Sequence, residues 1–190
     1  APMAMCQDVT VFLNAIGSAS IIVGDVDNGS SDNCAISTMT ISQSSFDCSH
    51  LGANTVTLTV TDASGNVSTC TSTVTVIDNI APTAICQDIT VYLDSTGNVT
   101  IDSTDTDNGS TDNCSIVTMS LSQTAFDCSH VGIANTVTVT VTDQSGNVST
   151  CTSTVTVIDN VNPTAICQDA TVYLDATGNT IITTANVDGG

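Results

Sequence analysis

The residues with the clearest capacity for chemistry in this sequence are aspartates gathered in short polar segments. The segment GDVDNGSSDN, residues 24–33, recurs as TDTDNGSTDN at residues 104–113. Carboxylate and amide oxygens beside a turn-forming glycine are the hard ligands that Ca²⁺ takes. We therefore expect calcium sites here. The candidate ligands in these segments and in a partial third copy are Asp25, Asp27, Asp32, Asp105, Asp107, Asp112 and Asp188.

Other metals fit these segments less well. The spacing is not that of an EF-hand, because the chain has no Glu to supply the bidentate last ligand. Mg²⁺ demands stricter geometry and keeps more water, and His50 and His130 are too few for zinc. The alternative is that the segments are ordinary polar turns, in which aspartates such as Asp62 and Asp143 bond to nearby backbone.

Charge favours the metal interpretation and excludes several partners. The 190 residues include 19 acidic side chains, no Lys and no Arg, for a formal net charge of −19. No side chain can neutralise clustered carboxylates, which repel one another. The same lack of cations excludes nucleic acid and anionic membrane surfaces as partners. Hydrophobic residues make up 41% of the chain, which argues against a disordered acidic segment, and no apolar run is long enough to insert in a membrane.

The elements that must position these aspartates repeat along the chain. Cysteines at 6, 34, 48 and 70 recur at 86, 114, 128 and 151, and a ninth follows at 167. The offset is 80 residues for three pairs and 81 for the fourth, because Ile133 is inserted. We divide the chain into a first repeat (1–80), a second repeat (81–161) and a partial repeat (162–190) that holds the first two strands. The first six residues do not resemble a signal peptide. We expect a segment of a longer tandem array, or a chain whose last strands complete a neighbouring subunit.

Each repeat has the pattern of a β-sandwich. Val56, Leu58 and Val60 alternate with threonines, and turn residues punctuate such runs. Short strands at this spacing predict an all-β fold of tandem immunoglobulin-like antiparallel β-sandwiches of about 80 residues. The expected strands of the first repeat lie near 5–13, 19–24, 34–41, 45–48, 54–61 and 66–77.

The cysteines indicate disulfides formed outside the cytoplasm. Nine cysteines are widely spaced and no CxxC motif is present, which favours a disulfide framework over a metal or redox site. We pair Cys6 with Cys70 and Cys34 with Cys48, although four cysteines allow three pairings. The equivalent pairs are Cys86–Cys151 and Cys114–Cys128. Cys6 is out of phase with Val9, so an irregularity near residues 7–8 is required.

The sandwich topology suggests where calcium would bind. In an immunoglobulin-like fold the loops at 25–33 and 62–66 share the end that meets the preceding domain. The linker residue Asp78 would then reach Asp105, Asp107 and Asp143 of the next repeat. Asp62 holds the position of Asp143 in the first repeat and is a candidate ligand there. Asp159 would do the same with Asp188. These positions predict a calcium ion at each junction between domains.

The ordered motifs resemble a known family. PTAICQDITVYLD, DTDNGSTDNC, FDCS and VTVTVTDQSGNVSTCTSTVTVIDN follow one another, and this combination is similar to the hyaline-repeat-type modules of large secreted surface proteins of Bacteroidetes-type bacteria. The resemblance covers the whole chain. It implies an immunoglobulin-like sandwich that serves as a spacer or filament unit in adhesins and surface fibres. The first repeat departs from the pattern with APMAMC and with Asn14 in place of Asp94.

The sequence gives little support for an enzyme. Ser49 and His50 are adjacent rather than arranged as nucleophile and base. We predict a secreted structural repeat of an extracellular bacterial filament or adhesin stalk, with neighbouring repeats or subunits of the same protein as partners. The alternative is a glycan- or protein-binding adhesion module. Sequons such as Asn28-Gly29-Ser30 would accept covalent glycans.

Overall fold

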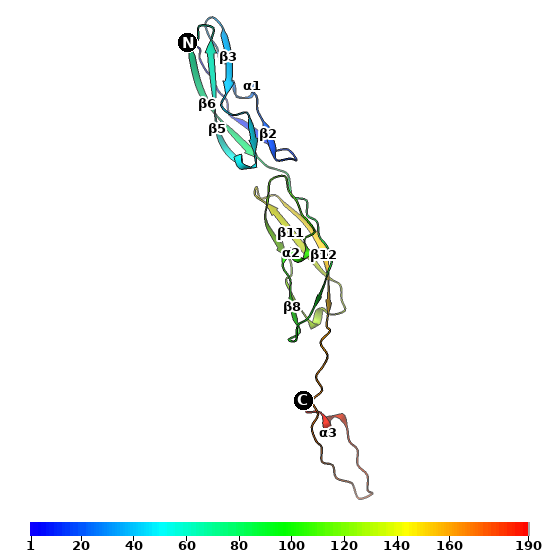
Figure 1. The fold of residues 1–190 in the computed structure, drawn as a ribbon. Helices are drawn as coiled ribbons and strands as arrows, with labels where there is room; N and C mark the ends of the chain where they lie inside the picture. The colour runs from blue at the N-terminus through cyan, green and yellow to red at the C-terminus, as the bar shows by residue number, and fades with distance from the viewer. Residues whose placement is uncertain (190) are drawn as a thin grey trace.

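The computed structural model describes residues 1–189 and places two sandwiches end to end (Figure 1). Strands β1 to β6 form the first sandwich, and strands β7 to β12 form the second. Beyond β12 the chain continues as an extended segment that loops back near its end (Figure 1). The fold is all-β, with immunoglobulin-like sheets in tandem, as the alternation of Val and Thr predicts.

The first sandwich combines a four-stranded and a two-stranded sheet. The larger sheet has the order β1-β6-β5-β3, and the smaller one pairs β2 with β4. Its elements are β1 (Val9–Phe12), β2 (Ser18–Ser20), the one-turn helix α1 (Val23–Val26), β3 (Ile36–Ile41), β4 (Ser45–Asp47), the 3₁₀ turn η1 (Cys48–His50), β5 (Gly52–Asp62) and β6 (Val67–Ile77).

The second sandwich repeats this plan, with the sheets β7-β12-β11-β9 and β10-β8. Its elements are β7 (Ile89–Tyr92), β8 (Asn98–Thr100), α2 (Ser103–Thr106), β9 (Ile116–Leu121), β10 (Ala125–Asp127), η2 (Cys128–His130), β11 (Asn135–Asp143) and β12 (Val148–Ile158).

Two details differ from the expected antiparallel strands. The first strand of each sandwich pairs in parallel with the last, with Val9 opposite Val74 and Ile89 opposite Val155. A parallel pair is possible because the other strands of the sandwich lie between the two in sequence, so no tight hairpin joins them. The strand expected at 19–24 ends at Ser20, because residues 23–26 form the turn α1.

The period-two residues form the core of each sandwich. Val56, Leu58 and Val60 are fully buried, and they pack in one cluster with Phe46 and Val74. The alternating threonines of β5 and β6 lie on the other face of the sheet. Burial of these apolar side chains is the main source of stability in so small a domain.

Two disulfides lie within the sandwiches and match the pairs expected from the sequence. Cys6 bonds to Cys70, and Cys86 bonds to Cys151. Regular pairing does break at residues 7–8, as the phase of Cys6 requires. Gln7 N donates to Val26 O at 2.9 Å, and Asp8 Oδ1 accepts from Thr73 N at 2.7 Å.

The other two expected pairs are wrong, because the third disulfide joins the two sandwiches. Cys48 bonds to Cys114, with Cα atoms 5.4 Å apart, so neither Cys34–Cys48 nor Cys114–Cys128 forms. Cys34 precedes β3 at the end of the sandwich where Ile36 pairs with Asp62. Cys48 lies at the opposite end, beside the turn at Gly17. Two cysteines at opposite ends of one sandwich cannot approach within bonding distance.

The partial repeat does not form the two strands expected of it. Between residues 162 and 189 the structure holds only the helical turn α3 (Thr184–Val187) and an isolated bridge between Cys167 and Asp188. In the complete repeats, β1 and β7 depend on ladders with β6 and β12. The sequence contains no third copy of that last strand. Every helix in the described residues is a single turn, and none is long and apolar enough to cross a membrane.

Candidate functional site: a carboxylate cluster between the sandwiches

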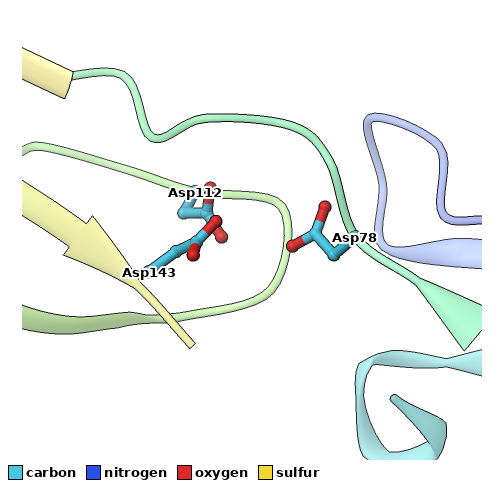
Figure 2. A group of neighbouring side chains, drawn as sticks. All are labelled: Asp78, Asp112 and Asp143. Carbon is cyan, nitrogen blue, oxygen red and sulfur yellow. The ribbon is translucent and has the colours of Figure 1, made fainter. Parts of the chain in front are cut away.

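Three aspartates meet where the first sandwich joins the second. Asp78 follows β6, Asp112 precedes β9, and Asp143 ends β11. One carboxylate oxygen from each lies within 4.8 Å of the others. Figure 2 shows Asp112 and Asp143 side by side, with Asp78 pointing toward them from the linker. We call these three residues the junction cluster.

The loop after β11 fixes the carboxylate of Asp143. Its Oδ1 accepts hydrogen bonds from Ser145 N at 2.9 Å and Asn147 N at 2.8 Å. Its Oδ2 accepts from Asn147 Nδ2 at 2.8 Å. Asp143 is 3% exposed, so this network holds its side chain in place away from solvent.

The other two carboxylates keep one oxygen each without a partner. Asp112 Oδ2 accepts from Cys114 N at 2.9 Å, and Asp78 Oδ1 accepts from Asn113 Nδ2 at 3.1 Å. Among the described residues, the buried side-chain atoms without a hydrogen-bond partner are Asp78 Oδ2, Asp112 Oδ1 and Asn113 Oδ1. All three are oxygens, and all three belong to this junction. Buried polar atoms are normally satisfied, so these three oxygens form a cluster of acceptors that could bind a cation.

Electrostatics leads to the same conclusion. Two unit charges 4.8 Å apart repel by about 3.5 kcal/mol at an effective dielectric constant near 20. Three such pairs give about 10 kcal/mol, which is comparable to the whole stability of a small domain. No Lys or Arg exists in the chain to offset this repulsion. A divalent cation bound among the oxygens would turn the repulsion into attraction.

Direct contacts between the sandwiches surround the cluster. Asn147 Nδ2 donates to the backbone oxygens of Asp78 and Ile80 at 3.2 and 3.3 Å. Asn113 Nδ2 also lies 3.4 Å from Asn14 O. A Cβ on Gly17 would lie 2.5 Å from Asn113 O and 2.8 Å from Cys48 Sγ, so the glycine allows the loops to approach closely. The Cys48–Cys114 disulfide closes this side of the joint.

Several predicted ligands are used elsewhere in the structure. Asp25 Oδ2 accepts from Ile22 N at 2.7 Å, and Asp105 Oδ2 accepts from Asp102 N at 2.8 Å. These bonds close the turns α1 and α2. Asp27 and Asp107 each accept from the backbone three residues later. The structure therefore brings Asp112, rather than Asp105 or Asp107, to Asp78 and Asp143.

The remaining candidates occupy equivalent positions at the two outer ends. Asp32 and Asp62 lie in the loops of the first sandwich that correspond to those of Asp112 and Asp143. Asp159 follows β12 as Asp78 follows β6. Asp188 bridges to Cys167 in the partial repeat. None of these four belongs to the junction cluster.

Most loop aspartates act as backbone caps, as the alternative interpretation of the polar turns expects. Eight of them have a pKa below the ordinary value of 3.8, and the main cause is a side-chain hydrogen bond from a Ser, Thr or Asn two to four residues later. These capping aspartates are Asp27, Asp47, Asp62, Asp94, Asp102, Asp107, Asp127 and Asp175.

Ser49 and His50 belong to such a cap and not to a catalytic arrangement. Ser49 Oγ donates to Asp47 Oδ1 at 2.6 Å, and His50 Nδ1 lies 2.8 Å from the same oxygen. Ser49 Oγ also lies 3.3 Å from His50 Nδ1, but its shorter contact is to the carboxylate, and all three side chains belong to one capped turn.

Asn113 and Asn147 are junction residues that the sequence analysis did not single out. Both belong to motifs that recur in the two repeats, DNC at 32–34 and 112–114 and SGN at 64–66 and 145–147. This recurrence was the available signal. It could not reveal that the two asparagines bond to the preceding sandwich.

Comparison with known proteins places the chain only by architecture. No protein-family model matches it, and no curated protein sequence gives a significant match. Among solved structures, it is similar to a human mucin-like protocadherin EC1-2 fragment at 14% identity and TM-score 0.43, with 84% of this chain and 98% of that one covered. A titin I-band fragment, I67–I69, gives 12% identity and TM-score 0.41, with coverages of 83% and 66%.

A third similar structure is the extracellular cadherin domains 1–4 of protocadherin gamma B7. It gives 11% identity and TM-score 0.39, and the alignment covers 90% of this chain and 54% of that one. The chain thus spans about half of that fragment. These structures are tandem immunoglobulin-like or cadherin-like domains, and similarity at this level says nothing about what this chain binds. The chain itself has tandem immunoglobulin-like sandwiches with three disulfides, an organisation typical of extracellular structural or adhesion modules.

Proposed function

We propose that this chain is a stiff structural segment of an extracellular bacterial fibre or adhesin stalk, in which Ca²⁺ locks each joint between sandwiches. The repeats 1–80 and 81–161 are the units, and neighbouring repeats of the same kind are their partners. The resemblance to hyaline-repeat-type modules supports this role. The observation that carries the proposal is the junction cluster with its unpartnered oxygens.

The position of the cluster gives the ion a mechanical role. Asp78 comes from the linker, whereas Asp112 and Asp143 belong to the second sandwich (Figure 2). Bending at the joint would move Asp78 away from the other two and break its bond to the ion. The binding energy of the ion therefore opposes bending, so the ion would hold the two sandwiches in a fixed orientation.

The ligand set favours calcium over other ions. All candidate donors are carboxylate or amide oxygens, and Ca²⁺ accepts six to eight such ligands in flexible geometry. Asp78, Asp112, Asp143 and Asn113 would supply protein ligands, with water completing the shell. Calcium sites of extracellular modules have Kd values of roughly 10⁻⁴–10⁻³ M, and we expect this range here.

Calorimetric titration and small-angle X-ray scattering test the proposal together. We expect calcium to bind with heat and to narrow the distribution of end-to-end distances, whereas a chelator broadens it. The Cys48→Ser variant should show the larger change, because the disulfide no longer limits the joint. Asp112→Asn should weaken binding at the junction, while Asp32→Asn, at the equivalent position of the first sandwich, should leave that binding intact.

Two outcomes would refute the proposal. One is the absence of any calcium heat at millimolar concentration. The other is binding that Asp112→Asn leaves unchanged. Magnesium at the same concentration serves as the comparison, and it should bind more weakly because it demands a stricter octahedral shell.

A further inference from the structure

The disulfide between the sandwiches uses two positions of the repeat that also carry exposed thiols. Cys48 of the first repeat bonds to Cys114 of the second. Eighty residues away in each case, Cys128 occupies the position of Cys48, and Cys34 occupies that of Cys114. Both are unbonded and exposed. The two sandwiches therefore display one copy of each half of the bond, one at each outer end of the pair.

The loop around Cys34 already has the conformation of the bonded loop. Cys34 N donates to Asp32 Oδ2 at 2.9 Å, and Cys114 N donates to Asp112 Oδ2 at the same distance. A thiol at this position thus needs no local refolding to accept a partner.

The surroundings of Cys128 match those of Cys48 equally well. Each cysteine begins a 3₁₀ turn capped by the preceding aspartate. Cys48 Sγ lies 3.8 Å from Gly17 O, and Cys128 Sγ lies 3.8 Å from Gly97 O. In the bonded copy a Cβ on this glycine would lie 2.5 Å from Asn113 O of the next sandwich. Gly97 leaves the same space open at the outer end.

The carboxylates are divided between the two ends in the same way. Asp62 Oδ1 accepts from Ser64 N at 2.8 Å and Asn66 N at 2.9 Å, which repeats the network of Asp143. At the other end, Asp159 Oδ1 accepts from Val161 N at 2.9 Å, as Asp78 Oδ1 does from Ile80 N. The leading end of the first sandwich and the trailing end of the second are therefore complementary halves of the observed joint.

We propose that Cys34 and Cys128 are covalent attachment points, and that Cys34 of one sandwich forms a disulfide with the Cys128 position of a neighbouring sandwich of the same kind. Each joint of the array then carries one such bond. This inference rests on the proposed fibre function and names its partner surface. The ends fit a second copy of this chain because each reproduces one side of a joint that the chain itself contains.

The chemistry balances with a disulfide oxidant of the glutathione class. The Cys128 thiolate attacks glutathione disulfide, forms a mixed disulfide and releases one glutathione thiol. The Cys34 thiolate then attacks the protein sulfur of that mixed disulfide and releases the second glutathione. The two protein thiols lose two electrons and two protons in total, and the oxidant gains them.

Complementary cysteine variants of the full chain test this pairing. Both variants carry Cys167→Ser, which removes the remaining exposed thiol. One adds Cys34→Ser and the other adds Cys128→Ser. Each variant is incubated alone and in a mixture with the other, in glutathione redox buffer with calcium. The products are then separated on non-reducing gels. We expect a disulfide-linked dimer in the mixture and no dimer from either variant alone, because each variant lacks one of the two cysteines that form the bond.

Peptide mapping identifies the bond that forms. Trypsin is of no use without Lys or Arg, so a protease that cleaves before aspartate is used. The expected dimer contains peptide 32–46 joined to peptide 127–142, and every sample should contain peptide 47–61 joined to 112–126 from Cys48–Cys114.

Three results would overturn the proposal. The first is a mixture that stays monomeric although the 47–61 to 112–126 link is present, since that link shows a folded joint. The second is a dimer from either variant alone, which would mean like-with-like pairing. The third is peptide 32–46 joined to 47–61, which would restore pairing within the repeat. Calcium stiffening is measured separately on each monomeric variant, so failure of the fibre function is distinguishable from failure of this bond.

Discussion

Replacing Asp112 by Asn should change thermal stability in opposite directions with and without calcium. The substitution keeps the side chain's shape, and its remaining oxygen still accepts from Cys114 N. It removes one of the three charges of the junction cluster. In a chelator the variant should unfold at a higher temperature than the parent chain. In calcium it should unfold at a lower temperature.

The size of the effect follows from the geometry. Asp112 takes part in two of the three repulsive pairs, whose oxygens lie within 4.8 Å of one another; at that limit each pair is worth about 3.5 kcal/mol at an effective dielectric constant near 20. Opening of the joint relieves much of this repulsion. Each 1 kcal/mol of repulsion that remains in the calcium-free folded chain, and that the substitution removes, should raise Tm by about 4–8 °C in a domain of this size. With calcium at a hundredfold excess over Kd the ion adds about 2.7 kcal/mol, and a tenfold loss of affinity removes about 1.4 kcal/mol of it.

Differential scanning calorimetry is the appropriate assay, because the chain has no Trp and only two Tyr. Asp32→Asn is the matched control, since Asp32 makes the same backbone bond to Cys34 N but lies outside the junction cluster. Its melting temperature should respond to calcium as the parent chain does. If Asp112→Asn lowers Tm equally in calcium and in chelator, Asp112 is only a backbone cap, and its charge contributes neither repulsion nor calcium binding at the junction.

Three further perturbations test other parts of the structure. The capping aspartates have depressed pKa values in the folded chain, so their stabilisation is complete above the ordinary pKa of 3.8 and is lost as pH falls below it; circular dichroism should show Tm falling steeply there. Removing the bond by Cys6→Ala with Cys70→Ala should cost about 4 kcal/mol, because it closes a loop of 64 residues; urea unfolding measures this. Gly17→Ala should loosen the joint in scattering experiments, because its Cβ would meet Asn113 O at 2.5 Å, whereas Gly97→Ala carries the same positive-φ strain without that contact.

Each of these has a contradicting result. A Tm that is flat between pH 5 and pH 2 would mean that the caps do not favour the ionised form. An unchanged urea midpoint after loss of the first disulfide would show that the unfolded chain gains no freedom. Equal scattering of the two glycine variants would show that the close approach at the joint has no mechanical role.

The repeating pattern alone determined the architecture within each sandwich. Alternation of Val and Thr placed Val56, Leu58 and Val60 in the core, because a strand turns successive side chains to opposite faces. The 80-residue offset identified the units, and the Cys6–Cys70 pair, expected as one of three possible pairings, is the bond that forms. These features are local or confined to one repeat, so a single sequence encodes them.

The loops were harder to predict because several aspartates in one polar segment compete for two tasks. In residues 104–113 the turn α2 uses Asp105 to close its own backbone, and only Asp112 is directed to the junction. Composition identifies such a segment as a calcium candidate. Which carboxylate remains free is decided by local hydrogen bonds that form once the turn has folded.

The sequence by itself determined the strands, the repeat and the excess of uncompensated negative charge. Only the tertiary structure decided that Cys48 bonds to Cys114 and that Asp78 faces Asp112 and Asp143. Both depend on how one sandwich is placed against the next. Residues more than 30 positions apart meet there through the rigid-body arrangement of two domains, and no periodicity within a repeat specifies that arrangement.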